Sequence, residues 1–205
     1  MSENEHNTKQ CICDAASVEF LENGYQSASL RRIVQKAGVT TGAFYGYYKS
    51  KEELFDALVE KEYNYIIELY NKILNEFTQL TPESQRGDMQ DYTSVGMNYM
   101  ISYMYDHKVA FKLILCCSVG TRYENFIHEL AEMDIKATHD FSETMENVGV
   151  TMKSVNPQLE HMITSGMFSA FFEMIVHDIP QEDSSEYIKQ LLDFYSAGWQ
   201  KIMGF

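Results

Sequence analysis

The strongest constraint on the fold lies in one segment of 23 residues, SLRRIVQKAGVTTGAFYGYYKSK, which runs from Ser29 to Lys51. Its pattern predicts two short helices joined by a tight Gly-Val-Thr turn. Gly38 can adopt the left-handed backbone that closes a helix, and the Thr40 hydroxyl is suited to cap the helix that follows. Two helices joined in this way form a helix-turn-helix, an arrangement that proteins use to read duplex DNA.

The formal charges of this segment are all positive. Five basic residues lie in it: Arg31, Arg32, Lys36, Lys49 and Lys51. The whole chain has a net charge of −14, yet residues 1–51 carry six Lys or Arg against five Asp or Glu. Because DNA repels an acidic body, this asymmetry predicts docking of a polyanion at the amino-terminal end alone. Charge by itself leaves open the alternative of a solvated basic face.

Composition favours an ordered globular protein of one or two domains. The chain has 205 residues, of which 45% are hydrophobic and only three are proline. No apolar run approaches the ~20 residues of a membrane span, so we expect no contact with a membrane. The polar start MSENEHNTKQ lacks a signal region, which predicts a cytoplasmic location. Four cysteines without zinc-site spacing are then expected to be reduced thiols: Cys11, Cys13, Cys116 and Cys117.

Hydrophobic spacing is helical along the whole chain, so the expected fold class is all-α. After a frayed tail over residues 1–8, helices are expected near residues 9–23, 30–37, 41–48, 51–80, 88–107, 109–118, 122–148 and 157–178, with a last one from Ser184 or Ser185 to the carboxyl end. Thr40 and Asn156 are expected N-caps, and Ser50 with Glu53 forms a capping box. We expect a helix-turn-helix DNA-binding domain over residues 1–48 and a larger all-helical domain over residues 49–205.

The expected helix over residues 41–48 has an unusual composition. Phe44 and Tyr48 are one turn apart and can pack inward. Gly42 and Gly46 each destabilise a helix by about 0.5–1 kcal/mol relative to alanine. Two glycines in so short a helix indicate that its backbone approaches something closely, with a loosely packed helix as the alternative.

These residues carry a family resemblance. Ala37-Gly38-Val39-Thr40, Gly42-Ala43-Phe44-Tyr45-Gly46-Tyr47-Tyr48 and Lys49-Ser50-Lys51-Glu52-Glu53-Leu54 closely resemble the amino-terminal domain of the TetR family of bacterial transcriptional regulators, over about residues 12–59. Two residues depart from the family pattern. Glu19 stands where an apolar residue is usual, which we expect to loosen the first helix, and Gly46 replaces a bulkier residue.

The resemblance implies a regulator of transcription, by the family's usual sign a repressor, and neither an enzyme nor a cofactor protein. It implies a homodimer on a palindromic double-stranded operator, released by a small effector, with residues 49–205 as the effector-binding and dimerisation domain. The location that it implies is the cytoplasm of a bacterium, on the nucleoid. The residues that it implies in DNA contact are Ser29, Arg31, Thr40, Thr41, Gly42, Ala43, Tyr45, Tyr47 and Lys51. Among these, Lys51 is expected to hold a phosphate.

The remainder of the chain is rich in Tyr and Met, which suit an adaptable, mostly apolar pocket. The candidate ligand-binding residues are Tyr63, Tyr70, Met97, Met100, Tyr103, Met104, Phe111 and Tyr123. Ordinary core is the competing explanation for any one of them. An apolar or aromatic effector is expected, and the acidity of this domain also allows a cationic one.

The last two expected helices each carry an apolar face, which two subunits can pack into a four-helix interface. The candidate interface residues are Met167, Ala170, Phe171, Met174, Leu191 and Tyr195. Core packing within one subunit is the alternative.

Two rival functions remain open at this point. One is an effector-blind DNA-binding regulator, whose compact core would leave no cavity. The other is a helical metal-binding protein or enzyme, suggested by His139 with Glu143 and by Glu173 with His177, each pair one helical turn apart. No nucleophile motif, phosphate loop or HExxH sequence supports the second.

Overall fold

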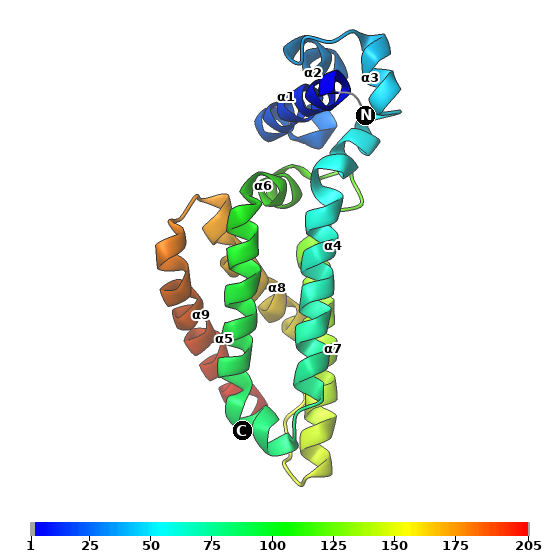
Figure 1. Cartoon of the computed structure of the whole chain (residues 1–205). Helices are drawn as coiled ribbons and strands as arrows, with labels where there is room; N and C mark the ends of the chain where they lie inside the picture. The colour runs from blue at the N-terminus through cyan, green and yellow to red at the C-terminus, as the bar shows by residue number, and fades with distance from the viewer. Residues whose placement is uncertain (1–2, 205) are drawn as a thin grey trace. The chain divides into compact units, whose positions relative to one another are not determined.

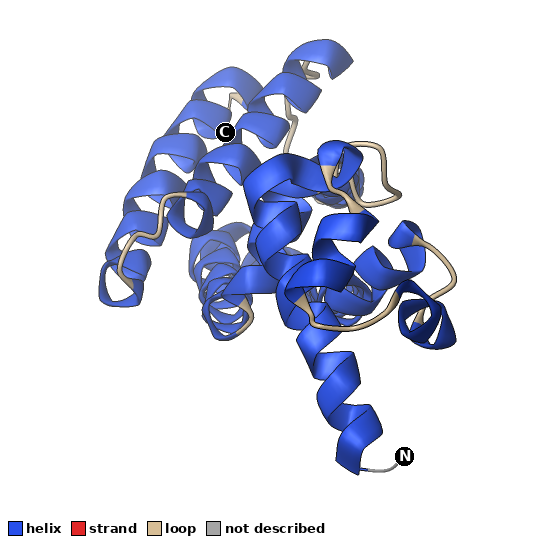
Figure 2. Ribbon diagram, turned by 90° about the horizontal axis from the view of Figure 1, so that it is seen from above, coloured by secondary structure: helices blue, strands red, loops and turns tan. Residues whose placement is uncertain are grey.

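The computed structural model describes residues 3–204, with side chains from residue 7 onwards. The described residues form helices and no strand, as the sequence predicts (Figure 2). In chain order the helices are α1 (Glu3–Ser27), α2 (Leu30–Lys36), α3 (Thr41–Tyr47), α4 (Lys51–Thr78), α5 (Pro82–Asp106), α6 (Lys108–Cys117), α7 (Phe126–Asn147), α8 (Pro157–Val176) and α9 (Gln181–Met203). None of them combines the length and the apolar character that crossing a membrane requires.

The chain packs as two units (Figure 1). Unit 1 comprises Met1–Tyr65 and His107–Glu124, and unit 2 comprises Ile66–Asp106 and Asn125–Phe205. Helix α4 therefore begins in unit 1 and ends in unit 2. Helix α6 lies in unit 1, against α1, although its place in the sequence suggested the second domain. The expected division into functional domains at residue 48 remains a prediction.

The expected caps form. The Thr40 Oγ1 accepts a hydrogen bond from the Ala43 N–H at 3.1 Å, and the Asn156 side chain accepts from the second and third residues of α8. In the capping box, the Ser50 Oγ accepts from the Glu53 N–H at 3.0 Å. The Glu53 carboxylate in turn accepts from the N–H of Lys49, one residue earlier than expected. These bonds satisfy amide groups that the first turn of a helix leaves without partners.

Several helix limits differ from those expected. Helix α1 begins at Glu3 although a frayed tail was expected up to residue 8; Met1 and Ser2 lie outside the described residues. Helix α5 begins at Pro82, six residues early, because proline fits the first position of a helix and Thr81 Oγ1 accepts from the Ser84 N–H. Helix α7 starts four residues late, after a hydrogen-bonded loop, and α9 starts at Gln181.

Aromatic side chains form the core of unit 1. Phe20 and Phe55 meet edge to face with ring centroids 5.1 Å apart, and Tyr123 extends the cluster to Tyr63 at 5.0 Å. The side chains of Phe20, Phe55 and Tyr123 are fully buried. This cluster ties α1, α4 and the segment after α6 into one body.

In unit 2, α7 packs on α8 and α5 packs on α9, while α8 and α9 also contact each other (Figure 1). Phe168 and Phe172 of α8 are fully buried among these helices. A second apolar cluster forms near the carboxyl end from Phe141, Met145, Met152 and Met203. The helices of unit 2 thus surround a core made mostly of aromatic and methionine side chains.

Candidate functional site

The turn between α2 and α3 has the geometry that its sequence predicts. Gly38 has a φ of +67°, and its N–H donates to the Gln35 carbonyl at 3.2 Å. The next N–H, of Val39, donates to the Val34 carbonyl, also at 3.2 Å. This pair of bonds is a Schellman motif, and its left-handed residue is glycine because a Cβ there would be strained. The turn fixes the direction in which α3 leaves α2.

Helix α3 buries one side and exposes the other. Phe44 is fully buried and Tyr48, just after the helix, is 3% exposed, so both pack inward as predicted. The outer side consists of exposed residues: Thr41, Gly42, Ala43, Tyr45 and Gly46. A methyl group added at Gly46 would meet no atom within 4 Å, and one at Gly42 would meet only the Thr40 hydroxyl at 3.9 Å. Packing within the chain therefore does not explain either glycine.

Ion pairs with α1 engage two of the five basic side chains. The Arg32 guanidinium pairs with Glu19 at 2.5 Å, and the Lys36 ammonium pairs with Glu22 at 3.1 Å. The exposed side chains of Arg31 and Lys49 have no ion-pair partner among the residues whose side chains are described. Positive charge that is free to meet a polyanion thus concentrates on Arg31 and Lys49.

Glu19 joins α1 to α2 through one of its carboxylate oxygens, while the other is buried without a described partner; that this residue loosens the first helix stays a prediction. Its buried carboxylate accepts from the Ser29 N–H at 3.0 Å and from the Arg32 Nε at 2.7 Å. The bond from Arg32 is the main reason that the pKa of Glu19 lies below its ordinary value, against the opposing effect of burial. The carboxylate therefore satisfies the N–H of Ser29, the residue that caps α2.

Lys51 is engaged within unit 1. Its ammonium donates to the carbonyls of Tyr25, Gln26 and Ala28 at 2.7, 3.1 and 3.2 Å. It also lies 4.6 Å from the centre of the Tyr25 ring. Burial lowers the pKa of this lysine. Since three carbonyls occupy its three N–H donors, a direct bond to a phosphate would require the release of one of them.

The other residues expected at DNA differ in exposure. Arg31, Thr40, Thr41, Gly42, Ala43 and Tyr45 are exposed, whereas Ser29 and Tyr47 are half-buried. All of them lie in unit 1 and surround the turn or follow it along α3. The feature that sequence reasoning missed is the pairing of Arg32 and Lys36 with acids of α1, because those acids lie 13 and 14 residues away in the chain.

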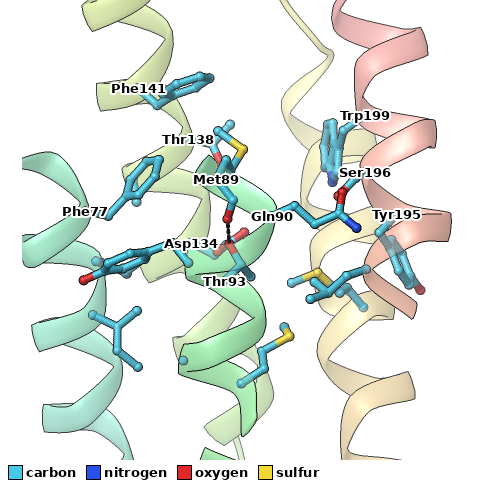
Figure 3. A pocket seen from close by; sticks show the side chains of 18 of the residues that line it. Phe77, Met89, Gln90, Thr93, Asp134, Thr138, Phe141, Tyr195, Ser196 and Trp199 are labelled. Atoms are coloured by element: carbon cyan, nitrogen blue, oxygen red, sulfur yellow. Dashed lines mark hydrogen bonds between the residues drawn. The ribbon is translucent and has the colours of Figure 1, made fainter. Parts of the chain in front are cut away.

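Unit 2 contains a cavity with a volume of about 270 Å³. Residues from the end of α4 and from α5, α7, α8 and α9 line it, and most of them are apolar or aromatic. Figure 3 shows Asp134 and Thr93 between two groups of rings, Phe77 with Phe141 and Tyr195 with Trp199. The hydroxyl of Tyr70, another lining residue, donates to the Asp134 carboxylate.

Only two of the eight candidate ligand residues, Tyr70 and Met97, line this cavity. Met100, Tyr103 and Met104 lie on α5 but outside its wall, while three others belong to unit 1: Tyr63, Phe111 and Tyr123. The Tyr123 hydroxyl donates to Asp56 at 2.8 Å, so that residue serves the core of unit 1. Richness in Tyr and Met predicted a cavity but did not predict which helix faces enclose it.

The candidate dimer residues are divided between core and cavity. Met167, Phe171 and Met174 are buried within unit 2, and Met167 and Tyr195 line the cavity. Ala170 and Leu191 are half-buried. Other apolar side chains of the same two helices are exposed instead: Leu159 and Met162 on α8, and Tyr187, Phe194 and Ile202 on α9.

Four of the described histidines contact carboxylates or each other: His128, His139, His161 and His177. His139 contacts Glu160 at 2.9 Å, His177 contacts Glu173 at 2.6 Å, and His161 contacts Glu132 at 3.0 Å. Among the described residues, no group of three or more His, Cys, Asp or Glu side chains has an arrangement that would hold a metal ion. His139 of α7 thus contacts Glu160 of α8, where the sequence suggested Glu143 of its own helix as the partner.

An exposed, glycine-bearing second helix behind a tight turn, with free positive charge beside it, is characteristic of helix-turn-helix proteins that bind DNA. Comparison with known proteins gives the same indication. Residues 12–58 match the model of the bacterial regulatory proteins of the tetR family. The amino-terminal part of the chain is thus similar to the domain that this model describes.

Individual relatives are similar to part of the chain. The chain is 40% identical over 60 residues to the transposon Tn10 TetC protein of Escherichia coli, a match that covers 29% of this chain and 30% of TetC. It is 22% identical over 160 residues to YhgD of Bacillus subtilis, an uncharacterised HTH-type transcriptional regulator, covering 77% of this chain and 70% of YhgD. The match to the first of these relatives thus spans less than a third of its length.

The fold extends the likeness to the rest of the chain. The structure of the transcriptional regulator FadR from Bacillus subtilis, solved in complex with stearoyl-CoA, superposes with a TM-score of 0.54 over 92% of this chain and 98% of FadR. The sequence identity is 17%, so this likeness concerns the fold alone. The described helices therefore have the architecture of a helix-turn-helix domain followed by a larger helical domain.

Proposed function

We propose that the protein is a transcriptional repressor that binds a palindromic operator as a homodimer and leaves it when a small molecule enters the cavity of unit 2. The observation that carries this proposal is the outer side of α3. It is exposed, it has two glycines that no contact with a described residue requires, and the nearby charges of Arg31 and Lys49 form no ion pair with the described side chains. Because glycine has no side chain, the backbone at these two positions can approach the base edges and the phosphates of DNA closely.

The proposed roles at DNA follow from exposure. Thr40, Thr41 and Ala43 face bases or nearby phosphates, and the Ala43 methyl suits a thymine methyl group. The hydroxyls of Tyr45 and Tyr47 hold phosphates. Arg31 contributes charge from α2, and Ser29 offers its hydroxyl beside it. Lys51 takes a different role, because its hydrogen bonds to two carbonyls of α1 and to that of Ala28, just after the helix, make it a brace between the end of α1 and α4.

The proposed homodimer uses the outer surfaces of α8 and α9. Phe194 is 73% exposed and Met162 is 70% exposed, on two helices that contact each other. Apolar side chains gathered in this way mark an interaction surface more often than an ordinary surface. A two-fold dimer presents its α3 helices about 34–36 Å apart, which is one turn of DNA, and so requires an operator with two-fold symmetry.

Phe194→Glu should convert the homodimer into monomers, because two carboxylates would be buried near the centre of a self-complementary interface. Light scattering after gel filtration gives the mass directly. Val119→Glu is the matched control, since Val119 is 62% exposed but lies outside α8 and α9. A dimeric Phe194→Glu variant would contradict the use of this surface.

The proposed effector is a small apolar or aromatic molecule. The cavity favours a sensor over an effector-blind regulator, since a fully packed core would leave no such space. FadR, which has a similar fold, was solved with stearoyl-CoA bound. Helix α4 offers a route for the signal, because it carries Tyr70 in the cavity wall and begins with Lys51 in unit 1. Displacement of α4 by a ligand would misplace the paired α3 helices and weaken operator binding.

Footprinting of the purified protein on the DNA that flanks its own gene tests the proposal. Protection of an inverted repeat, with half-site centres about 10 base pairs apart or a multiple of that, is the expected result. Circular dichroism on the same sample shows whether the helices are intact. A folded protein that retards no fragment, even at low salt where phosphate contacts are strongest, would refute DNA binding.

A further inference from the structure

The wall of the cavity carries an isolated negative charge. Asp134 is the one carboxylate among the described residues that line the cavity, and Arg86 is the one basic residue among them. Asp134 forms no ion pair with Arg86 or with any other described residue. The remaining polar groups of the wall are hydroxyls and amides, which carry no charge at neutral pH.

The Asp134 carboxylate is only partly satisfied. The Tyr70 hydroxyl donates to its Oδ1, and no other described group donates to either oxygen. A carboxylate removed from water needs several donors or a cation to offset the lost hydration. One phenol does not supply that, so Asp134 retains capacity to bind a positively charged group.

The surroundings of Asp134 raise its affinity for a proton. Burial raises the pKa of Asp134, the Tyr70 hydrogen bond opposes this rise, and the negative charge of Glu160 adds to it. The titratable and charged groups around it are Tyr70 on α4, Arg86 and Tyr92 on α5, His139 on α7, Glu160 on α8 and Tyr195 on α9. Of these, Arg86 is exposed to solvent and His139 contacts Glu160.

Aromatic rings complete a site for a cation. Trp199 and Tyr195 from α9 lie on one side of Asp134, and Phe77 from α4 and Phe141 from α7 lie on the other (Figure 3). The face of such a ring attracts a cation within about 6 Å, and attracts it more strongly when water is excluded. At about 270 Å³ the cavity lies slightly below the usual range for ligand sites, so its occupant is small.

We infer that the cavity accepts a small organic cation, an amine or quaternary ammonium group on an apolar body, with Asp134 as its counter-ion and the surrounding rings as its walls. The inference rests on the proposed function only in taking this cavity as the effector site. An anionic effector would be repelled by the Asp134 carboxylate. Arg86, the one basic residue among the described residues of the wall, is exposed to solvent and is not held in the cavity by an ion pair with Asp134.

The single tryptophan of the chain, Trp199, lines the cavity and gives a direct optical signal. The full-length protein is titrated with benzyltrimethylammonium and, separately, with neopentylbenzene, which has the same shape but no charge. We expect saturable quenching of Trp199 by the cation and binding at least about tenfold weaker for the neutral compound, because only the cation compensates Asp134. Equal affinities, or no binding of the cation, would overturn the inference.

The Asp134→Asn variant tests the counter-ion. It keeps the shape of the side chain, and we expect it to lose about tenfold or more in affinity for the cation while the affinity for neopentylbenzene stays unchanged. Asp140→Asn is the matched control, because Asp140 is exposed on the same helix and outside the cavity wall. A thermal melt of each variant reports folding. Unchanged cation affinity in a folded Asp134→Asn protein would overturn the role of Asp134.

The pH dependence provides a readout that a merely structural role would not give. Since the protonated carboxyl of Asp134 cannot pair with a permanent cation, affinity should rise with pH through its raised pKa and then level off. The Asn variant should show no such rise. Gel retardation of DNA without the cation separates the two proposals: a folded protein that binds the cation but retards no DNA in its absence refutes the proposed repressor and supports the cation site.

Discussion

Replacement of Lys51 by methionine distinguishes two roles that the sequence alone could not separate. Methionine keeps the unbranched length of the side chain and removes the ammonium group. If Lys51 braces α1 against α4, Lys51→Met destabilises the fold and leaves the salt dependence of DNA binding almost unchanged. If Lys51 holds a phosphate, stability stays the same and the salt dependence changes.

The magnitude follows from the contacts. The ammonium makes three hydrogen bonds, of 2.7, 3.1 and 3.2 Å, and lies 4.6 Å from the Tyr25 ring centre. Each bond from a charged donor has a net value of about 1.5–3 kcal/mol, but water can replace the donor at the exposed Gln26 carbonyl. Allowing for this and for partial exposure of Lys51, the loss should be about 3 kcal/mol. For a chain of this size that lowers the melting midpoint by about 6–12 °C.

Lys49→Met is the matched control, because Lys49 is exposed and has no described ion-pair partner. Its free energy of unfolding should change by less than about 0.5 kcal/mol. The slope of log affinity against log salt should fall by roughly 0.9 for each protomer, as expected for the loss of one phosphate contact. Melting curves and gel retardation at several salt concentrations measure both quantities. A Lys51→Met protein with unchanged stability and a reduced slope would refute the brace.

Two further changes test the architecture around α3 and α2. Gly46→Ala should raise the free energy of unfolding by about 0.5–1 kcal/mol, since the methyl meets nothing within 4 Å, and should weaken operator binding. Unchanged binding in retardation gels would show that DNA does not approach this backbone closely. Arg32→Met should lower the free energy of unfolding at neutral pH, because it leaves the buried Glu19 carboxylate without its main partner. In the parent protein, the lowered pKa of Glu19 stabilises the fold above its ordinary value of 4.5, and this stabilisation is lost as pH falls through the lowered pKa. The gap between parent and variant in urea denaturation should therefore narrow below about pH 4.5, and a constant gap would contradict the ion pair.

Local signals in the sequence predicted local structure well. The turn at Gly38, the caps at Thr40 and Asn156 and the inward packing of Phe44 and Tyr48 are all as expected. Each depends on groups only a few residues apart, so the side-chain chemistry of one residue almost decides the outcome. The start of α5 at Pro82 was missed although it has such signals, a proline at the first helical position and the Thr81 cap. The stretch that follows is polar and lacks the apolar periodicity by which the helix was predicted.

Contacts between distant segments were beyond such reasoning. Nothing near Glu19 in the sequence identifies Arg32 as its partner, and nothing near Lys51 identifies the carbonyls at the end of α1. The resemblance to the TetR family suggested a phosphate for Lys51, and the fold engages that ammonium internally. The family match in residues 12–58 supports the DNA-binding module itself, because its motif combines several residues at fixed spacing.

The sequence by itself determined the all-helical fold, the helix-turn-helix and the concentration of positive charge at one end, since these follow from the order of residues along the chain. Only the tertiary structure decided which charges remain free, which unit includes α6 and which side chains enclose the cavity with Asp134. The physical reason is that the helical repeat of apolar residues shows which face of a helix is buried, but not which other helix covers that face. Whether Trp199 or Tyr195 packs into a core, a cavity or a second subunit depends on helices that lie tens of residues away in the chain.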